Sequence, residues 1–288
     1  MENNTDLLQN INASYKSMSK GQKLIAQYIL ENYDKAAFIT ASKMGKVVGV
    51  SESTVVRFAY ALGYDGYPEL QRSLQEMIRN RLTSVQRIQL TSEINENDVL
   101  KTVLKADMQN IRATIESIDE TAFENVVDAM LKGRVVYVLG QRSSTPLAEF
   151  FGYYLNFVLD NVRTVTTGTA DIFEQMVRIG AEDVCIGISF PRYSTRTVEG
   201  MKFAKQKGAY VIAITDSTLS PLSECADSTL VARSDMASFA DSLVAPLSLI
   251  NAVIVAASMR KKEEVSEHFS QLEAIWDKQR TYVAKDNK

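Results

Sequence analysis

The sequence has few of the residues that small secreted domains and metal sites depend on. Only two cysteines, Cys185 and Cys225, occur among 288 residues, without CxxC spacing, and there is a single histidine, His268. Neither a disulfide framework nor a zinc site is therefore expected. We expect no metal and no cofactor, and two unpaired cysteines fit a reducing, cytoplasmic compartment best.

An export signal and a long apolar run are also missing. The first ten residues, MENNTDLLQN, have neither the positive patch nor the apolar stretch of a signal peptide. The longest largely apolar run, residues 243–257, is broken by three residues, Pro246, Ser248 and Asn251. It is also shorter than the about 20 residues that a membrane-spanning helix needs. The run predicts a buried helix, and no membrane partner is expected.

The chain as a whole carries no excess of positive charge. Lys and Arg number 32 against 35 Asp and Glu, for a formal net charge of −3, and 45% of the residues are hydrophobic. This composition is typical of a folded protein and excludes disorder, collagen and fibrous coiled coil as descriptions of the whole chain. A surface for nucleic acid must therefore be local.

The two halves of the chain differ in the spacing of their apolar residues. From residue 7 to about residue 81 the spacing is helical, and no strand-like run appears. The polar stretch TSVQRIQLTSEINEND, residues 83–98, is the predicted linker. We therefore expect an all-α domain over residues 1–82 and a second domain over residues 99–288.

The second domain alternates strands with helices. After predicted helices at 99–117 and 121–131, five short apolar runs follow, at residues 134–139, 162–167, 183–189, 210–215 and 228–232. Strands that are apolar on both faces and separated by helices indicate right-handed crossovers and a parallel sheet. We predict a doubly wound, five-stranded parallel α/β sandwich of the flavodoxin-like kind. In such sheets ligands bind beyond the carboxyl ends of the strands.

Residues 39–67 of the first domain have helix-turn-helix spacing. A helix is followed by a tight turn at Gly49 and Val50 and by a second helix that Ser51 caps. We predict a DNA contact surface made of Ser51, Glu52, Ser53, Thr54, Arg57 and Tyr60, with Lys43 and Lys46 on the preceding helix. Residues 35–82 carry seven Lys or Arg against four Asp or Glu, a local charge of +3 that suits phosphate contact.

The stretch ASKMGKVVGVSESTVVRFAYALGYDGYPELQ resembles the helix-turn-helix domain of the RpiR-type bacterial transcriptional regulators. The resemblance covers nearly all of residues 5–80 and implies that a double-stranded DNA operator is a partner. The pattern of the residues alone leaves an alternative, a three-helix bundle that merely packs on the second domain.

Two strand-to-helix turns of the second domain combine hydroxyl groups with an arginine. The first contains Arg142, Ser143 and Ser144, and the second contains Ser189, Arg192, Ser194 and Thr195. Backbone N–H groups at a helix N-terminus and an arginine side chain both favour phosphate or carboxylate. We predict a site for a small anionic metabolite between the turns. The alternative is that the Ser and Thr side chains only cap their helices.

The stretch ISFPRYSTRTVEGMKFAKQKGAYVIAIT resembles the sugar isomerase (SIS) domain of the same regulators, over about residues 120–260. The family motif G-x-G-x-S falls on Gly140, Arg142 and Ser144, and the motif S-x-S-G-x-T falls on Ser189, Pro191, Arg192 and Ser194. The resemblance implies that Ser144, Ser189 and Ser194 bind the phosphate of a phosphosugar. Arg142 and Pro191-Arg192 depart from the family pattern, which predicts a narrower and more cationic pocket. A smaller or more anionic metabolite is therefore an alternative ligand.

Because SIS domains also occur in aldose-ketose isomerases, catalysis is the rival hypothesis. Such an isomerase needs a general base near neutral pKa. His268 lies at the edge of the apolar face of a C-terminal helix, and Glu149 and Glu174 are expected one turn or more into their helices. We predict no catalytic residue and no enzyme activity, because a sensor needs the DNA-binding half and an isomerase does not. A third hypothesis is a phosphosugar-binding protein that only serves as a scaffold for another protein.

The predicted helix over residues 239–260 is apolar nearly all round. A surface helix of a globular domain is normally apolar on one side only, so this helix predicts self-association into a homodimer or a higher homo-oligomer. A two-fold dimer would present two recognition helices to a palindromic operator. Deep burial within one chain is the alternative.

Overall fold

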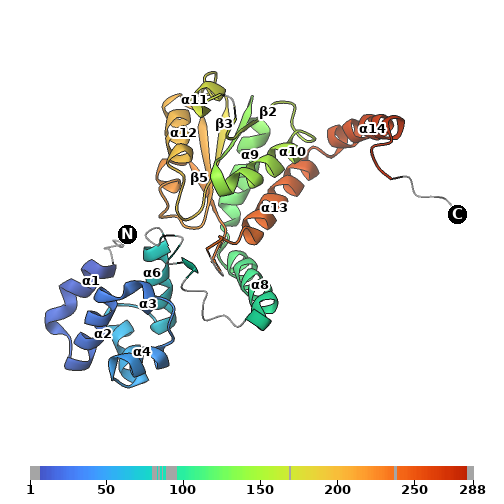
Figure 1. Ribbon diagram of the computed structural model, residues 1–288. Helices are drawn as coiled ribbons and strands as arrows, with labels where there is room; N and C mark the ends of the chain where they lie inside the picture. Colours follow the sequence, from blue (N-terminus) through green and yellow to red (C-terminus); the bar gives the residue numbers. More distant parts are fainter. Residues whose placement is uncertain are drawn as a thin grey trace. The chain divides into compact units, whose positions relative to one another are not determined.

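The computed structural model describes residues 7–79, 83, 85, 87–88, 96–168, 170–236 and 239–283. The chain forms two compact units, Met1–Asn97 and Asp98–Lys288 (Figure 1). Most of the stretch predicted as a linker, residues 83–98, lies outside the described residues. The exact limits of the two domains and of the linker stay a prediction.

The first unit is helical throughout its described residues, as predicted. Its elements are α1 (Leu7–Ser14), the 3-10 turn η1 (Tyr15–Ser17), α2 (Lys20–Glu31), α3 (Tyr33–Ala36), α4 (Ala41–Val48), α5 (Glu52–Ala61) and α6 (Tyr67–Arg79). Apolar residues at helical spacing, among them Ile25, Ile29, Met44, Phe58 and Leu70, are fully buried in its core. Their burial fixes which sides of α4 and α5 face outward.

The turn between α4 and α5 has the predicted helix-turn-helix form. Gly49 ends α4 with left-handed backbone, φ 80°. The side chain of Ser51 then accepts a hydrogen bond from the backbone N–H of Thr54 and caps α5. A Cβ atom on Gly45 would lie 2.8 Å from the carbonyl oxygen of Val50, so a glycine here lets the turn pack closely on α4. The helix-turn-helix prediction is confirmed.

The second unit contains one parallel sheet with strand order β2-β1-β3-β4-β5. The strands are β1 (Val136–Gly140), β2 (Val162–Val165), β3 (Val184–Ile188), β4 (Tyr210–Thr215) and β5 (Ser228–Val231). The predicted five-stranded parallel sheet is confirmed, and the strand ends differ from the prediction by at most two residues. The largest differences are at β1, which starts at Val136, and at β2, which ends at Val165 because Thr166 and Thr167 belong to the following loop.

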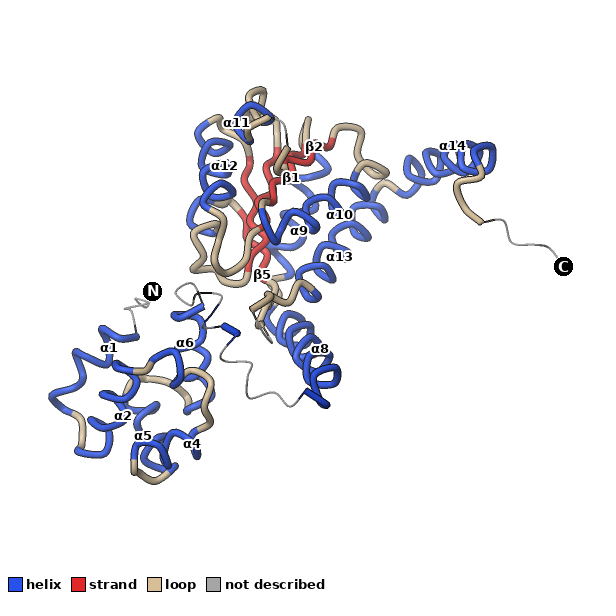
Figure 2. Tube along the Cα trace, viewed as in Figure 1, coloured by secondary structure: helices blue, strands red, loops and turns tan. Residues whose placement is uncertain are grey.

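Helices cover both faces of the sheet (Figures 1 and 2). On one face lie α9 (Glu120–Lys132), α10 (Thr145–Leu155) and α13 (Val244–Arg260), and on the other α11 (Ile172–Gln175) and α12 (Thr195–Gln206). Alternate strand residues divide between the two layers. Val138 and Ile186 belong to the first core, and Leu139 and Cys185 belong to the second. The doubly wound sandwich is therefore confirmed.

Helix α13 starts later than predicted, at Val244 and not at residue 239. Pro246 explains the difference, because a proline is tolerated in the first turn of a helix but breaks its interior. The apolar surface of α13 is also divided. Leu249, Ile250 and Val253 are buried, so burial within the chain accounts for one side, while Leu247 and several neighbours are exposed on the other.

Two further helices complete the second unit. Helix α8 (Val99–Ser117) packs on α13, and α14 (Lys262–Gln279) follows α13 and points away from the sheet (Figure 2). No single helix in the described ranges is long and apolar enough to span a membrane. Only α13 and α14 reach that length and composition together, and they meet at an angle of 99°.

Candidate functional site

The candidate ligand site lies where the order of the strands reverses, between β1 and β3. Strand β1 stands between β2 and β3, so the chain leaves β1 toward one side of the sheet and leaves β3 toward the other. Gly140 of β1 pairs with Ile188 of β3, which places the two turns that begin at Gln141 and Ser189 side by side. In open α/β sheets, ligands bind beyond the carboxyl ends of the strands at this switch point.

The first turn folds tightly back on β1. Arg142 has left-handed backbone, φ 58°, and opens the 3-10 turn η3 (Arg142–Ser144) before α10 begins. A Cβ atom on Gly140 would lie 2.8 Å from the carbonyl oxygen of Ser144, which explains the glycine at the end of the strand. Ser144 is only 2% exposed and stands at the N-cap of α10, yet its side chain makes no capping hydrogen bond. Capping alone therefore does not account for Ser144.

The second turn is held together by its serines. The Ser189 hydroxyl oxygen accepts a hydrogen bond of 3.0 Å from the backbone N–H of Ser194, and both residues are buried. The Ser194 side chain in turn accepts from the backbone N–H of Thr197 at 3.4 Å and caps α12. For Ser194, the alternative that the side chain only caps its helix is therefore sufficient. Arg192 in the same turn has left-handed backbone, φ 43°.

The two arginines stand out in the backbone geometry. Among the described residues, Arg142, Arg192 and Arg280 are the non-glycine positions with positive φ. Left-handed backbone costs a side chain other than glycine about 1 to 2 kcal/mol, and such strain concentrates at functional sites. The side chains of Arg142 and Arg192 are exposed, as are Ser143 and Thr195, at the rim of the buried serines.

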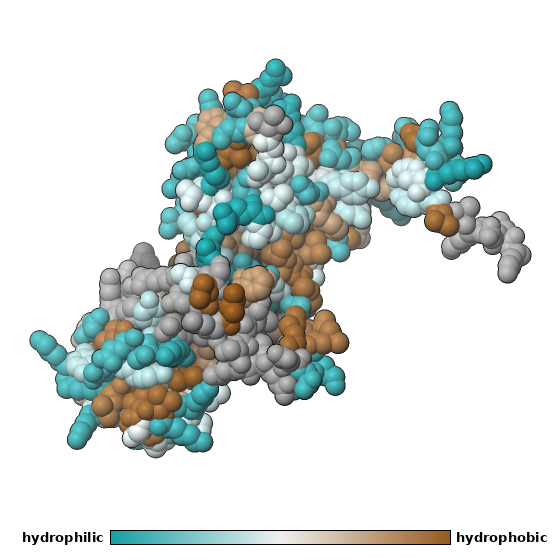
Figure 3. Space-filling model, in the orientation of Figure 1, coloured by the Kyte–Doolittle hydropathy of each residue, from teal (hydrophilic) through white to brown (hydrophobic). Residues whose placement is uncertain are grey.

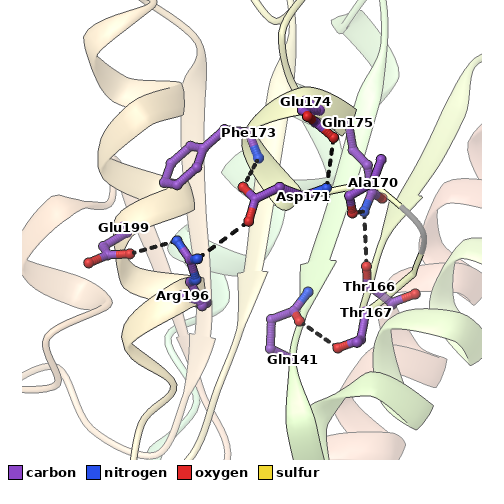
Figure 4. Close-up of polar contacts among 10 residues, drawn as sticks. All are labelled: Gln141, Thr166, Thr167, Ala170, Asp171, Phe173, Glu174, Gln175, Arg196 and Glu199. Carbon is purple, nitrogen blue, oxygen red and sulfur yellow. Dashed lines mark hydrogen bonds and ion pairs between the residues drawn. The ribbon is translucent and has the colours of Figure 1, made fainter.

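A polar network over the end of β1 was not predicted from the sequence (Figure 4). Gln141 is only 8% exposed, and its Oε1 atom accepts a hydrogen bond of 2.9 Å from the Thr167 hydroxyl in the loop after β2. The amide of Gln175 donates to the carbonyl oxygens of Thr166 and Ala170 and holds this loop on α11. The loop after β2 therefore forms a third side of the candidate site.

The same loop is linked to α12 through charged groups (Figure 4). Arg196 lies 3.4 Å from the Asp171 carboxylate and 3.5 Å from Glu199. Glu174 accepts a hydrogen bond from the backbone N–H of Asp171 in a capping box at the start of α11. The expectation that Glu174 lies one turn or more into its helix is therefore wrong, and its carboxylate has a structural partner. Glu149 is exposed on α10.

Two buried polar residues near the turns were also missed by sequence reasoning. Asp216 directly follows β4, is buried, and accepts a hydrogen bond of 2.8 Å from the Tyr193 hydroxyl. The Thr197 hydroxyl, in the first turn of α12, is buried and has no hydrogen-bond partner among the described residues. Glycine and methionine one turn later, Gly200 and Met201, pack on the sheet, so Thr197 lies on the side of α12 that faces the strands. The polar residues after the strand 210–215 were the available signal for Asp216.

The two cysteines and the single histidine lie apart from the two turns. Burial raises the pKa of the Cys185 thiol to about 12 and also raises the pKa of Cys225. His268 is exposed on α14, with its ring 6.4 Å from that of Phe157. No three His, Cys, Asp or Glu side chains gather as metal ligands within the described ranges.

Two cavities of the second unit lie away from the two turns. One, of about 510 Å³, is bounded by α8, α9 and α13. The other, of about 600 Å³, lies at the amino ends of the strands beside Arg134 and Asp183. The candidate ligand site therefore rests on the geometry of the turns and not on either cavity.

The predicted DNA surface lies on the outward side of α4 and α5. Glu52, Ser53 and Arg57 are exposed, as are Lys43 and Lys46, and Tyr60 is 58% exposed. The Nε atom of Arg57 donates to the carbonyl oxygen of Ser53 at 3.3 Å, which keeps the arginine along the helix. Exposed cationic and hydroxyl groups on one side of α5 are suited to phosphate and base contacts.

Two of the predicted DNA contacts are already used within the domain. The Ser51 hydroxyl caps α5 and also lies 2.8 Å from the hydroxyl of Thr54. Thr54 is partly buried, and its methyl group would lie 3.1 Å from a Cβ atom on Gly21 of α2. Thr54 is therefore less available to DNA than the exposed residues of α5, because its methyl group lies against α2, and its contact with DNA stays a prediction.

Comparison with protein families assigns both halves of the chain. Residues 5–81 match the helix-turn-helix domain of the rpiR family, and residues 130–256 match the SIS domain. The chain is 31% identical over 238 residues to an HTH-type transcriptional regulator of Haemophilus influenzae, which covers 80% of this chain and 81% of that protein.

Solved structures show the same fold. The sugar isomerase domain of an RpiR transcription factor from Sphaerobacter thermophilus is 25% identical, with a TM-score of 0.59, over 62% of this chain and 99% of that chain. The Vibrio vulnificus NanR protein, complexed with ManNAc-6P, is 19% identical, with a TM-score of 0.56, over 94% of this chain and 98% of that chain.

Proposed function

This chain belongs to the RpiR family of transcriptional regulators, with a helix-turn-helix domain and an SIS domain, and we propose that its SIS domain senses an anionic metabolite and thereby changes operator binding. The proposed effector surface consists of Arg142, Ser143, Ser144, Ser189, Arg192, Ser194 and Thr195. The proposed compartment is the cytoplasm, where operator DNA and metabolites are both present.

The observation that carries this proposal is the placement of two arginines at left-handed backbone, one in each turn of the switch point. If only the shape of the turns mattered, glycine would adopt the same backbone without strain. An arginine at each position adds a guanidinium group suited to bidentate contact with phosphate or carboxylate. A requirement for positive charge is therefore the simplest reason for the strain.

A phosphosugar is the ligand class that these groups suit best. The cationic rim favours a phosphate, and the exposed hydroxyl groups of Ser143 and Thr195 beside it are suited to hydrogen bonds with sugar hydroxyls. The bound ligand of the NanR protein, ManNAc-6P, is a compound of this class. A smaller or more anionic metabolite is the alternative that the two arginines leave open.

Operator recognition is proposed for α5, with a two-fold dimer placing two such helices on one palindrome. We propose that Leu247 and Met259, on the exposed side of α13, belong to the dimer interface. Leu247→Asp should lower the mass measured by sedimentation from dimer to monomer while the far-ultraviolet spectrum stays unchanged. A dimer of unaltered stability would remove this side of α13 from the interface.

Regulation then follows from linkage. The effector can shift the protein only by binding one arrangement of the dimer more tightly than the other, and the same difference in affinity changes operator binding. We propose no catalytic step. Glu174 is held in a cap, and an assay for aldose-ketose conversion of each effector candidate would expose an isomerase.

The experiment is a thermal-shift screen of the full chain against hexose 6-phosphates, ManNAc-6P, sugar acids and inorganic phosphate. A ligand at about 100 times its Kd should stabilise the protein by about 2.7 kcal/mol. Arg192→Ala should weaken binding by about 1.5 kcal/mol or more, and so reduce the shift by about half or more, without lowering the transition temperature of the free protein. The matched control is Arg178→Ala, since Arg178 is also exposed but precedes the amino end of β3. Equal shifts in both variants would contradict the proposed site.

A further inference from the structure

Helix α8 carries an apolar stripe that the described residues leave exposed. Leu100 is 71% exposed, Leu104 58%, Met108 69% and Ile115 70%, and Ile111 belongs to the same side of the helix. The spacing of these five residues, four, four, three and four positions, keeps them on one side of an α-helix. Figure 3 shows hydrophobic atoms gathered over α8 and the adjoining part of α13.

The side of α8 that packs on its own unit is, by contrast, partly polar. The Asn110 amide donates to the carbonyl oxygen of Asp235 at 2.9 Å, and its Oδ1 atom accepts from the backbone N–H of the same residue at 3.1 Å. The hydroxyl of Thr114 accepts from the backbone N–H of Arg233 at 2.9 Å. A helix on the surface normally turns its apolar side inward, so this arrangement indicates that the stripe is covered by another partner.

The stripe continues into the cavity of about 510 Å³ between α8, α9 and α13. Ile111 and Ile115 line this cavity together with Phe123 of α9 and Leu249 of α13. The stripe spans 16 residues, 100–115, or about 22 Å at a rise of 1.5 Å per residue, which is longer than a small ligand covers. A helix laid along α8 would match that length.

We propose that the stripe is covered by α8 of a second copy of this chain. Apolar residues at four- and three-residue intervals are the pattern by which two helices pack knobs into holes. Beside the stripe, Arg112 and Glu116 form an ion pair at 2.8 Å, which lowers the net positive charge that two identical helices bring together. This inference rests on the two-fold dimer of the proposed function. It adds a second contact between the two copies, through α8, to the proposed contact through α13.

The position of α8 in the chain gives this contact a regulatory role. Val99 opens α8 directly after the first unit ends at Asn97. A pair of α8 helices would therefore set the separation of the two chain segments that lead to the DNA-binding units. An effector that changes the packing of the pair would change operator affinity without touching α5.

Disulfide trapping in the full chain tests the pair. Met108 lies at the middle of the stripe, so it faces its own counterpart whether the two helices run parallel or antiparallel. In a Cys225→Ser background, Met108→Cys should form a covalent dimer on mild oxidation. The matched control is Gln109→Cys, which is also exposed but lies on the polar side of α8, and we expect trapping at least ten times slower.

A second variant measures the free energy of association through the dimer dissociation constant. Leu104→Asp should raise that constant at least tenfold by sedimentation, and Gln109→Asp should leave it unchanged. If the wild-type chain is dimeric but Met108→Cys is not trapped, the α8 contact is wrong while the proposed dimer stands. If Met108→Cys resists thiol reagents in a monomeric protein, the stripe is covered within one chain and the inference is overturned. A monomeric wild-type chain that still recognises one half-site would instead contradict the proposed dimeric regulator.

Discussion

The turn of the DNA-binding unit and the two turns of the candidate effector site all use left-handed backbone, but they reach it with different residues. Gly49 adopts φ 80° between α4 and α5, and a Cβ atom there would meet no neighbour within 4 Å. Arg142 and Arg192 adopt φ 58° and 43° beyond β1 and β3. A glycine is sufficient where only the path of the chain matters, so the two arginines mark turns in which the side chain has its own task.

The serines of the effector turns differ in a related way. Ser194 caps α12 and therefore contributes to the fold, whereas Ser144 is buried at the start of α10 without a capping hydrogen bond. Structural and ligand-binding roles can thus be separated within one candidate site. Substitutions in both units test this comparison, from the largest expected effect to the smallest.

The double substitution Arg142→Gly and Arg192→Gly should have opposite effects on ligand binding and on stability. Losing two charge-assisted hydrogen bonds should weaken effector binding by at least about 3 kcal/mol, or about a hundredfold. Relief of the left-handed strain should offset the flexibility of glycine, so the free energy of unfolding should stay level or rise. Calorimetric titration and thermal unfolding measure the two quantities. A marked loss of stability would show that the arginines brace the turns.

Arg57→Ala should weaken operator binding by about 1 to 3 kcal/mol if the guanidinium reads a base edge. Fluorescence anisotropy with an operator selected from random duplexes measures this loss. The loss should be larger on the operator than on random duplex. Equal losses would make Arg57 a phosphate contact, and no loss would take α5 out of the groove.

Gly49→Ala should lower the free energy of unfolding of the first unit by about 1 to 2 kcal/mol, because alanine is strained at φ 80°. Chemical denaturation followed by circular dichroism measures the change. Gly168→Ala is the control, since Gly168 is also open to solvent but has no positive φ. The same cost at both positions would mean that the left-handed turn is not what glycine provides.

Ser194→Ala should cost about 1 kcal/mol of stability through the lost cap. Ser144→Ala should stay within about 0.5 kcal/mol of wild type, yet it should weaken effector binding in the same direction as the loss of an arginine. Thermal unfolding of the free and liganded variants gives both numbers. A cost for Ser144→Ala as large as that of Ser194→Ala would return Ser144 to a structural role.

Sequence reasoning reached the features that depend on local patterns. The helix-turn-helix at Gly49 and Ser51 and the five strands follow from spacing and from turn chemistry, and both are confirmed. The helix over α13 was predicted to start at residue 239, five residues too early. That prediction followed the apolar composition of the segment and did not use the position of Pro246, which lies in the first turn of the helix. The stripe at Leu100, Leu104 and Met108 was also readable as a pattern, but its exposure was not.

Other features depend on residues that are distant in sequence and could not be predicted from local patterns. The hydrogen bond from Thr167 to Gln141 joins the ends of β1 and β2, and the bond from Tyr193 to Asp216 joins the turns after β3 and β4. Thr54 was expected to point outward, but Gly21 leaves room for its methyl group against α2. The left-handed backbone of Arg142, φ 58°, is likewise not visible in composition.

The most direct test of the account is the operator Kd, measured by anisotropy at one salt concentration with and without saturating effector. The wild-type chain should change its Kd by about 5- to 150-fold, the range that a coupling free energy of 1 to 3 kcal/mol gives. The Arg192→Ala chain should bind operator normally and need at least about tenfold more effector for the same change in Kd. An effector response of the same size in both proteins would contradict the claim that the arginine turns sense the ligand.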